Sequence, residues 1–219
     1  MKHQALRREI ISACIGMNAR GINQGTSGNV SVRVEEGLLI TPSGVPYDEM
    51  KPSDIVPMRL DGTHDGRLKP SSEWRFHTSI LAARPEVGAV VHTHSMFATT
   101  IGCCGLEIPA VHYMIAATGG SRIPCVPYIT YGTQELADAA LAALEGRSAC
   151  LLANHGMIVL GPTLKKAMWL AVEVETLAAQ YWRARQIGKP NILSDAQIQA
   201  VIEKFRTYGQ QPEPAPGCC

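Results

Sequence analysis

A β-hairpin close to the amino terminus constrains the fold of this 219-residue chain more than any other feature. Residues 30–34 alternate apolar and polar side chains, as a strand with one buried face does. A turn at residues 35–37 leads directly into the apolar run 38–40. Two strands joined by so short a turn are antiparallel, because parallel neighbours need a long crossover. The chain is therefore not a purely parallel, doubly wound protein.

Composition predicts a globular chain with its own core. Hydrophobic residues make up 46% of the sequence and charged residues 18%, and 20 Lys and Arg against 19 Asp and Glu give a net charge of +1. A chain of this size removes about 70% of its unfolded surface from water. The near-neutral balance, without a basic run, leaves no electrostatic footprint for nucleic acid. We expect a small molecule or a protein as partner, and no nucleic acid.

The sequence also argues against a membrane or secreted protein. Residues 1–21 scatter charges among apolar residues, unlike a signal peptide, and no later stretch approaches the ~18 apolar residues of a membrane helix. The 7 cysteines are an odd number without a C-x-x-C pair, which favours a reducing compartment. We expect a cytoplasmic protein without a membrane partner.

Hydrophobic periodicity predicts helices and strands in mixed order. Helical patterns cover about 4–20, 71–83, 95–102, 133–144, 164–186 and 194–208; strand patterns cover 55–60, 87–94, 149–153 and 157–160; extended segments cover 108–113 and 123–128. We predict an α/β fold with a largely antiparallel sheet. Residues 1–209 form one predicted domain, and the Pro-rich end 210–219 is predicted to be disordered.

Three histidines stand at the ends of apolar strands. His92 and His94 close one such strand, where residues two apart point to the same face about 7 Å apart. His155 follows another apolar strand and precedes Gly156, where we expect a sharp bend. A strand-end pair of histidines also occurs by chance, so His155 strengthens the case. Three neutral imidazoles with an open fourth position are typical of a catalytic zinc site.

Glu73 is predicted in the first turn of a helix opened by Ser71 and Ser72. The helix dipole favours a carboxylate there, so Glu73 is either a capping charge or a general acid/base that also touches the metal. His77 follows one turn later. It either reaches the site or is an ordinary packed or solvated histidine, and we expect the second.

Three polar stretches have groups that bind phosphate without Lys or Arg. They offer hydroxyls and backbone N–H groups freed by glycine or by a helix start. These stretches are 26–29, 43–44 and 71–72. Each alone is more often a turn or a cap. The third stretch immediately precedes Glu73, so a phosphate site beside a three-histidine metal indicates a phosphorylated small molecule as substrate.

In combination, these motifs resemble the class II aldolase/adducin family. The resemblance rests on residues 23–31, 41–44, 70–73, 91–94 and 154–156, and it extends to 72–77, 108–117 and 203–209. It covers nearly the whole chain up to the Pro-rich end. It implies a three-layer α/β fold with a central antiparallel sheet flanked by helices. It also implies a fourfold-symmetric homotetramer with active sites between subunits.

The resemblance also implies roles for individual residues. The metal is Zn²⁺, with Mn²⁺ or Co²⁺ as alternatives, on His92, His94 and His155, and Glu73 is the acid/base and a further metal contact. The residues that bind the substrate phosphate are Gly28, Asn29, Ser43, Gly44, Ser71 and Ser72. Tyr113, from a neighbouring subunit, acts on the leaving aldehyde oxygen. The aldehyde side is lined by Tyr131, Phe205 and Tyr208. Ser43 stands where the family usually has Thr, and Tyr131 where it usually has Phe.

The implied reaction is the reversible aldol cleavage of a ketose 1-phosphate to dihydroxyacetone phosphate and an aldehyde. The first interpretation is a substrate of the L-fuculose 1-phosphate type, which releases lactaldehyde. The alternative is 5-deoxyribulose 1-phosphate or 5-(methylthio)ribulose 1-phosphate, which share the phosphate end. More distant alternatives are a sugar-phosphate decarboxylase, epimerase or dehydratase, or a non-catalytic module like the adducin head. Epimerases carry Asp in place of Glu73, and the adducin head lacks the metal site, which argues against both.

Overall fold

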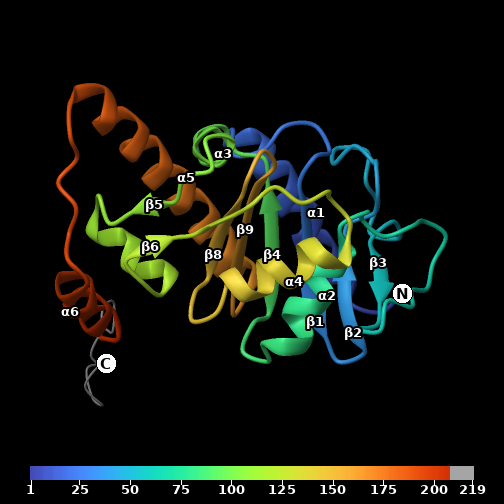
Figure 1. Ribbon diagram of the computed structural model, residues 1–219. Helices are drawn as coiled ribbons and strands as arrows, with labels where there is room; N and C mark the ends of the chain where they lie inside the picture. Colours follow the sequence, from blue (N-terminus) through green and yellow to red (C-terminus); the bar gives the residue numbers. More distant parts are fainter. Residues whose placement is uncertain (208–219) are drawn as a thin grey trace, which may run out of the picture.

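The computed structural model describes residues 1–207, and its centre is a seven-stranded mixed sheet (Figure 1). The strand order is β3-β2-β1-β4-β9-β8-β7. The strands are β1 (Asn29–Val34), β2 (Gly37–Ile40), β3 (Val56–Met58), β4 (Ala89–Thr93), β7 (Cys125–Val126), β8 (Ala149–Leu152) and β9 (Gly156–Gly161). Every neighbouring pair is antiparallel except β7 with β8, so the predicted largely antiparallel sheet is confirmed.

The register of three central strands brings polar strand ends to one edge of the sheet. β1 and β2 form the predicted hairpin, with Val34 opposite Gly37. On its other side β1 pairs with β4, which places Asn29 opposite His92. β4 also pairs with β9, which places His92 opposite Ile158. The start of β1, the end of β4 and the start of β9 therefore meet at the same edge.

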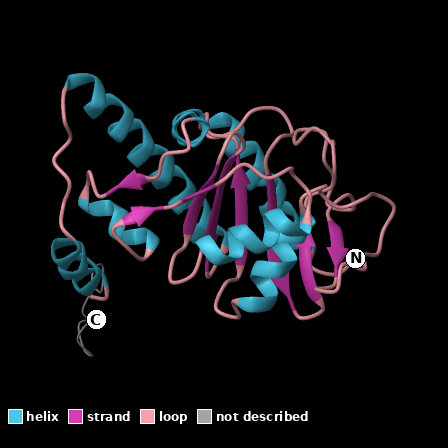
Figure 2. Ribbon diagram, in the orientation of Figure 1, coloured by secondary structure: helices cyan, strands magenta, loops and turns pink. Residues whose placement is uncertain are grey.

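Helices cover both faces of the sheet, which gives the three layers that the resemblance implies (Figure 2). One face carries α1 (Gln4–Ala19), α3 (Met96–Cys103) and α5 (Leu164–Ile187), and the other carries α2 (Trp74–Ala83) and α4 (Gln134–Ala143). Four of these helices lie within one residue of their predicted bounds, whereas α2 begins at Trp74, three residues after its predicted start.

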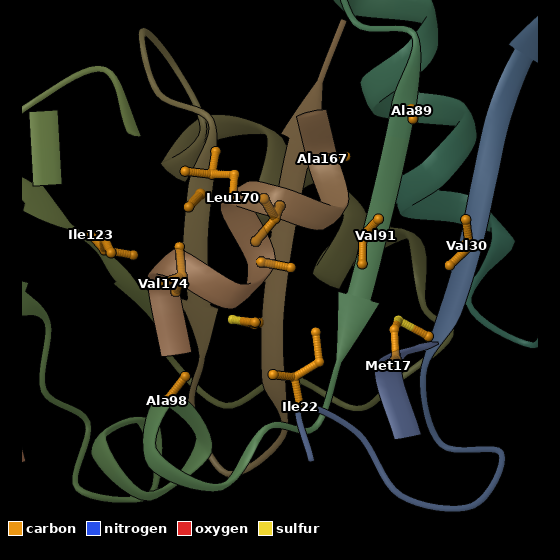
Figure 3. Close-up of a cluster of buried hydrophobic side chains, with 14 of the residues drawn as sticks. Met17, Ile22, Val30, Ala89, Val91, Ala98, Ile123, Ala167, Leu170 and Val174 are labelled. Atoms are coloured by element: carbon orange, nitrogen blue, oxygen red, sulfur yellow. The ribbon is translucent and has the colours of Figure 1, made fainter. Parts of the chain in front are cut away.

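Alternation along β4 divides the hydrophobic core into two clusters. Val91 belongs to the cluster on one face, together with Met17 of α1 and Val174 of α5 (Figure 3). Val90 packs with Phe76 of α2 on the other. Burial of each large apolar side chain stabilises the fold by about 1.5–3 kcal/mol. β4 is thus fixed from both sides, and so are the histidines at its end.

A smaller substructure lies beyond β7 and differs from the prediction. It consists of β5 (Ile108–Pro109), the 3₁₀ helix η1 (Tyr113–Thr118), β6 (Arg122–Ile123) and α6 (Asp195–Phe205). The predicted extended segment 108–113 is a strand only at its start, because the His112 side chain accepts a hydrogen bond from the Met114 N–H and begins η1. The predicted segment 123–128 is broken by Pro124 and Pro127, which lack the N–H of a sheet ladder.

Three further points concern membrane spans, the Pro-rich end and the end of the last helix. Among the described helices, none is both long and apolar enough to span a membrane. The predicted boundary at 209 and the Pro-rich end 210–219 lie outside the described residues. The last helix was predicted to reach 208, but α6 ends at Phe205.

Candidate metal centre

Four side chains meet at the polar edge of the central sheet. Glu73, His92, His94 and His155 each offer one ligand atom, and these atoms all lie within 4.8 Å of one another. Nε2 of His92 is 3.0 Å from Nε2 of His94 and 3.1 Å from Oε2 of Glu73. Nε2 of His155 is 3.1 Å from Oε1 of Glu73. Ligands of a tetrahedral metal with bonds of ~2.0–2.1 Å lie about 3.3 Å apart. The donor atoms therefore have nearly the spacing of a metal's ligand shell.

β4 positions two of the histidines and fixes the tautomer of one. Residues two apart on a strand share a face, and the rings of His92 and His94 lie edge to face at 4.9 Å. Nδ1 of the fully buried His92 is 2.9 Å from the carbonyl oxygen of Met157. A carbonyl only accepts, so Nδ1 carries the proton. Nε2 then keeps its lone pair for a metal.

The turn between β8 and β9 presents His155. Asn154 has a φ of 55°, a left-handed conformation that Asn tolerates better than most residues, so the sharp bend is confirmed. A Cβ on Gly156 would lie 2.9 Å from the ring of His94 and still closer to the carbonyl oxygen of Thr93. Glycine at this position therefore lets the turn approach β4 closely enough for His155 to face His94.

Glu73 lies immediately before α2, not in its first turn as predicted. The helix begins at Trp74 with Glu73 as its N-cap residue, and the Glu73 side chain makes no capping hydrogen bond. The Ser71 hydroxyl accepts a hydrogen bond from the Glu73 N–H at 3.3 Å, and the Glu73 carboxylate turns away from the helix toward Asn29, His92 and His155. That carboxylate is 4% exposed, and its Oε1 has no hydrogen-bond partner among the described residues.

Electrostatics at the cluster favour the forms that bind a metal. Burial alone raises the pKa of Glu73, but electrostatic attraction to His92 and close contacts with His155 and His92 outweigh it and hold this pKa well below its usual range. Burial, helped by repulsion from His92 and His155, lowers the pKa of His94 to about 4. Metal ligands must be an ionised carboxylate and neutral imidazoles, which is what these shifts favour.

The four residues fit a divalent metal ion. An unpartnered, buried carboxylate oxygen beside three imidazoles is the kind of group that a cation stabilises. Imidazole nitrogen and carboxylate oxygen are ligands of zinc, and imidazole also suits other transition metals. The structure thus brings together all four residues that the sequence predicted for the metal centre.

The three predicted phosphate-binding stretches also come together. Pro42 and Pro70 form an isolated β-bridge, and the N–H of Ser71 donates to the carbonyl oxygen of Thr41 at 2.9 Å. The N–H of Val30 donates to the Thr41 hydroxyl at 3.2 Å. Segments 28–29, 43–44 and 71–72 are therefore neighbours through the residues that flank them. Ser43, Gly44 and Ser72 are exposed, whereas Gly28, Asn29 and Ser71 are buried.

A cavity of about 310 Å³ opens onto the cluster. Its polar lining comes from Ser27, Ser72, Glu73, His94, Asn154 and His155. Tyr128, Ile129 and Tyr131 contribute an aromatic and aliphatic wall. Of these three, only Tyr131 was predicted for the site. Tyr128 and Ile129 could have been predicted from their place in the same loop as Tyr131. Arg75 anchors this loop by donating to the carbonyl oxygen of Gly132 at 2.7 Å.

Tyr113 and Phe205 lie elsewhere in the chain. They line a separate hollow of about 850 Å³, and their rings are 6.4 Å apart. Tyr113 is 48% exposed, and neither residue lines the cavity at the cluster. Within one chain, the structure does not bring these two predicted residues to the metal centre. Tyr208 lies outside the described residues.

Behind the cluster, the structure adds contacts that the sequence interpretation missed. Nδ2 of Asn29 donates to Oε2 of Glu73 at 2.9 Å, although Asn29 was predicted only as a phosphate ligand. His77 is fully buried and lies next to Asn29, so the expectation that it packs rather than joins the ligand cluster holds. The one sequence feature that could have indicated these contacts is the spacing of Asn29 and Ser31, which are two apart and so share one face of their strand.

Comparison with known proteins gives the same family that the motifs of the sequence resemble. Residues 8–182 match the family described as Class II Aldolase and Adducin N-terminal domain. The chain is 55% identical over 213 residues to a 5-methylthioribulose-1-phosphate/5-deoxyribulose-1-phosphate aldolase of Rhodospirillum rubrum, a match that covers 97% of this chain and 96% of that protein. It is 48% identical over 214 residues to an L-fuculose phosphate aldolase of Escherichia coli (strain K12), covering 97% and 100%.

The fold is similar as well. A solved structure of an L-fuculose 1-phosphate aldolase matches with a TM-score of 0.91 at 38% sequence identity, covering 94% of this chain and 98% of that one. The likeness spans both the sheet and the substructure beyond it. With the His and Glu cluster complete and the family match covering most of the chain, the protein is a metal-dependent class II aldolase and belongs to the class II aldolase and adducin family.

Proposed function

We propose that the protein catalyses the reversible aldol cleavage of 5-deoxyribulose 1-phosphate and 5-(methylthio)ribulose 1-phosphate. The products are dihydroxyacetone phosphate and a short aldehyde. The observation that carries this proposal is the composition of one cavity of about 310 Å³. It is lined by Ser27 and Ser72 of the phosphate stretches, by Glu73, His94 and His155 of the cluster, and by an aromatic and aliphatic wall.

The cavity lining and the phosphate stretches next to it suggest how the substrate lies. Of those stretches, Ser27 and Ser72 line the cavity itself. Backbone N–H groups and hydroxyls of segments 28–29, 43–44 and 71–72 hold the phosphate without a basic side chain. The carbonyl and its neighbouring hydroxyl then face the cluster. The far end of the ketose reaches Tyr128, Ile129 and Tyr131, where a methyl or methylthio group packs well. The 55% identical relative, whose name gives these two substrates, supports this choice.

His92, His94 and His155 are the proposed ligands of a Zn²⁺ ion, with Glu73 as a further ligand before substrate binds. Mn²⁺ or Co²⁺ fits the same donor set. Such a cation polarises the ketose carbonyl as a Lewis acid when bound.

The protein's own residues move the protons. In cleavage, the C4 hydroxyl gives up its proton, the C3–C4 bond breaks with its electron pair left on C3, and the C4 oxygen becomes the aldehyde. Glu73 delivers a proton to C3, which completes dihydroxyacetone phosphate; in the addition direction it removes that proton. Tyr113 of a neighbouring copy shuttles the proton of the C4 hydroxyl. A homotetramer with active sites between subunits is therefore part of the proposal, supported by the exposure of Tyr113 outside the cavity of its own chain.

L-Fuculose 1-phosphate is a second candidate. It carries an additional hydroxyl at C5, and two tyrosine side chains, Tyr128 and Tyr131, line the wall that this carbon reaches. The 48% identical relative is named for that substrate.

A substrate panel tests both candidates. Zn²⁺-loaded protein is assayed for release of dihydroxyacetone phosphate from the two proposed pentulose phosphates, from L-fuculose 1-phosphate, and from ribulose 1-phosphate as a control with a polar C5. We expect kcat/KM for the proposed pair to exceed that for the other two at least about tenfold, the usual effect of one apolar group in a fitted pocket. The opposite ranking selects the second candidate. No release from any of the four refutes the aldol proposal.

A further inference from the structure

A row of buried hydrogen bonds runs from the metal cluster into the space between α2 and β1. Nδ2 of Asn29 is 2.9 Å from Oε2 of Glu73, and Oδ1 of Asn29 is 2.6 Å from Nε2 of His77. Nδ1 of His77 is 2.7 Å from the hydroxyl of Ser31. Asn29 is 4% exposed, and His77 and Ser31 are fully buried, so water does not compete for these bonds.

The spacing of the sequence produces this row. Asn29 and Ser31 are two apart on β1 and share its inner face. Glu73 and His77 are four apart, one helical turn, at the start of α2. The strand pair and the helix pair therefore lie side by side, and the Asn29 side chain lies between the Glu73 carboxylate and the His77 ring.

Each hydrogen bond in the row dictates the next. A carboxylate only accepts, so Asn29 must turn its NH₂ group toward Glu73 and its carbonyl oxygen toward His77. His77 must then donate from Nε2. A neutral imidazole with a proton on Nε2 accepts at Nδ1, so the Ser31 hydroxyl donates to it. Burial lowers the pKa of His77 to about 3, which keeps this ring neutral. All donors point toward Glu73.

We propose that His77 is a positioning residue for Glu73, acting by locking the orientation of the Asn29 amide. Without the His77 donor, the amide can turn over and present its oxygen to the carboxylate oxygen. With it, one N–H of Asn29 always holds Oε2, and Oε1 stays directed toward His155. The inference rests on the proposed role of Glu73 in proton transfer.

Two amide variants of His77 separate positioning from packing. The side-chain amide of His77→Gln reaches about as far as Nε2 and keeps a donor for Asn29, whereas the shorter amide of His77→Asn reaches only the Nδ1 position near Ser31. In Zn²⁺-loaded protein we measure kcat, KM and the exchange of the C3 proton of dihydroxyacetone phosphate with solvent. We expect His77→Asn to lower kcat and exchange at least about tenfold, as loss of a supporting hydrogen bond commonly does, with KM nearly unchanged. We expect His77→Gln to stay close to the parent protein. Equal losses in both variants, or a loss confined to KM, overturn the proposal.

A second measurement needs no activity. In metal-free, uniformly ¹⁵N-labelled protein, the ring signals of His77 are identified by their disappearance in His77→Gln. We expect a protonated Nε2 and an unprotonated Nδ1. A proton on Nδ1 instead contradicts the direction of the row and overturns the proposal. Failure of the substrate panel, by contrast, refutes the proposed function while this tautomer result stands.

Discussion

At the scale of single residues, the two carboxylate oxygens of Glu73 have different surroundings. Oε2 accepts a hydrogen bond from Asn29 and lies 3.1 Å from His92. Oε1 faces His155 at 3.1 Å and has no hydrogen-bond partner among the described residues. One oxygen is therefore held by the protein, and the other remains for a cation or for a substrate proton. This asymmetry suits a group that must act as both ligand and acid/base.

Replacement of Glu73 by Gln tests this division. The shape is kept and the charge is lost, so the three histidines still bind a metal, but no carboxylate accepts the C3 proton. We expect near-parent metal content and a loss of proton exchange of about 10²–10⁴-fold, the usual contribution of a general acid/base. Metal analysis and NMR of dihydroxyacetone phosphate in deuterated buffer measure the two effects. The matched control is Glu86→Gln. Glu86 is exposed and lies before the first residue of β4, at the opposite end of the strand from the histidines. Undiminished exchange in Glu73→Gln removes Glu73 from the proposed role.

At the scale of elements, the sequence predicts what depends on short-range pattern. The alternation in β1 and the apolar run of β4 report burial on each sheet face, so the hairpin and the strand-end histidines can be read directly. The path of the chain after Ile108 cannot be read from the sequence in this way. It depends on a side-chain cap at His112 and on prolines whose effect depends on the neighbouring strand. Likewise, the contact of His77 with Asn29 joins residues 48 apart and arises only when α2 docks on β1. Periodicity carries no information about that docking.

Gly28, which leads into β1, shows how closely these elements meet. A Cβ at this position would lie 2.7 Å from Oδ1 of Asn23 and 2.7 Å from the backbone oxygen of His92. Gly28→Ala must therefore push β1 away from β4 at the metal centre. We expect a loss of unfolding free energy of about 1–3 kcal/mol, typical of overpacking, together with weaker Zn²⁺ binding. Urea denaturation and metal competition titration measure both.

The matched control is Gly188→Ala, where an added Cβ meets no atom within 4 Å. This variant should unfold and bind metal like the parent protein. If Gly28→Ala matches the control in both measurements, the close approach of β1 to β4 does not limit the site.

At the scale of the whole molecule, the proposed active-site residues of one chain fall into two places. The cluster and its 310 Å³ cavity lie at the polar edge of the main sheet. Tyr113 and Phe205 belong to η1 and α6, which pack together beyond β7 at the far side of the molecule (Figure 1). The two halves can work on one substrate only when the η1 end of one copy covers the cavity of another. A homo-oligomer with closed symmetry would complete every site in this way.

Mixing two inactive variants tests this arrangement. Glu73→Gln lacks the acid/base, and Tyr113→Phe lacks the phenol hydroxyl, so each homogeneous protein should cleave its ketose phosphate poorly. In a mixed oligomer, some sites combine the intact Glu73 of one chain with the intact Tyr113 of the other. Random exchange in a closed oligomer gives such a pair at about one quarter of the sites, and activity should recover toward that fraction. The mixed oligomers are made by unfolding the two variants together and refolding them. Each variant unfolded and refolded alone is the control, and native mass spectrometry verifies that mixed species form. Mixed oligomers without recovery, or full activity of a monomeric parent protein, would show that Tyr113 does not serve the site of a neighbouring copy.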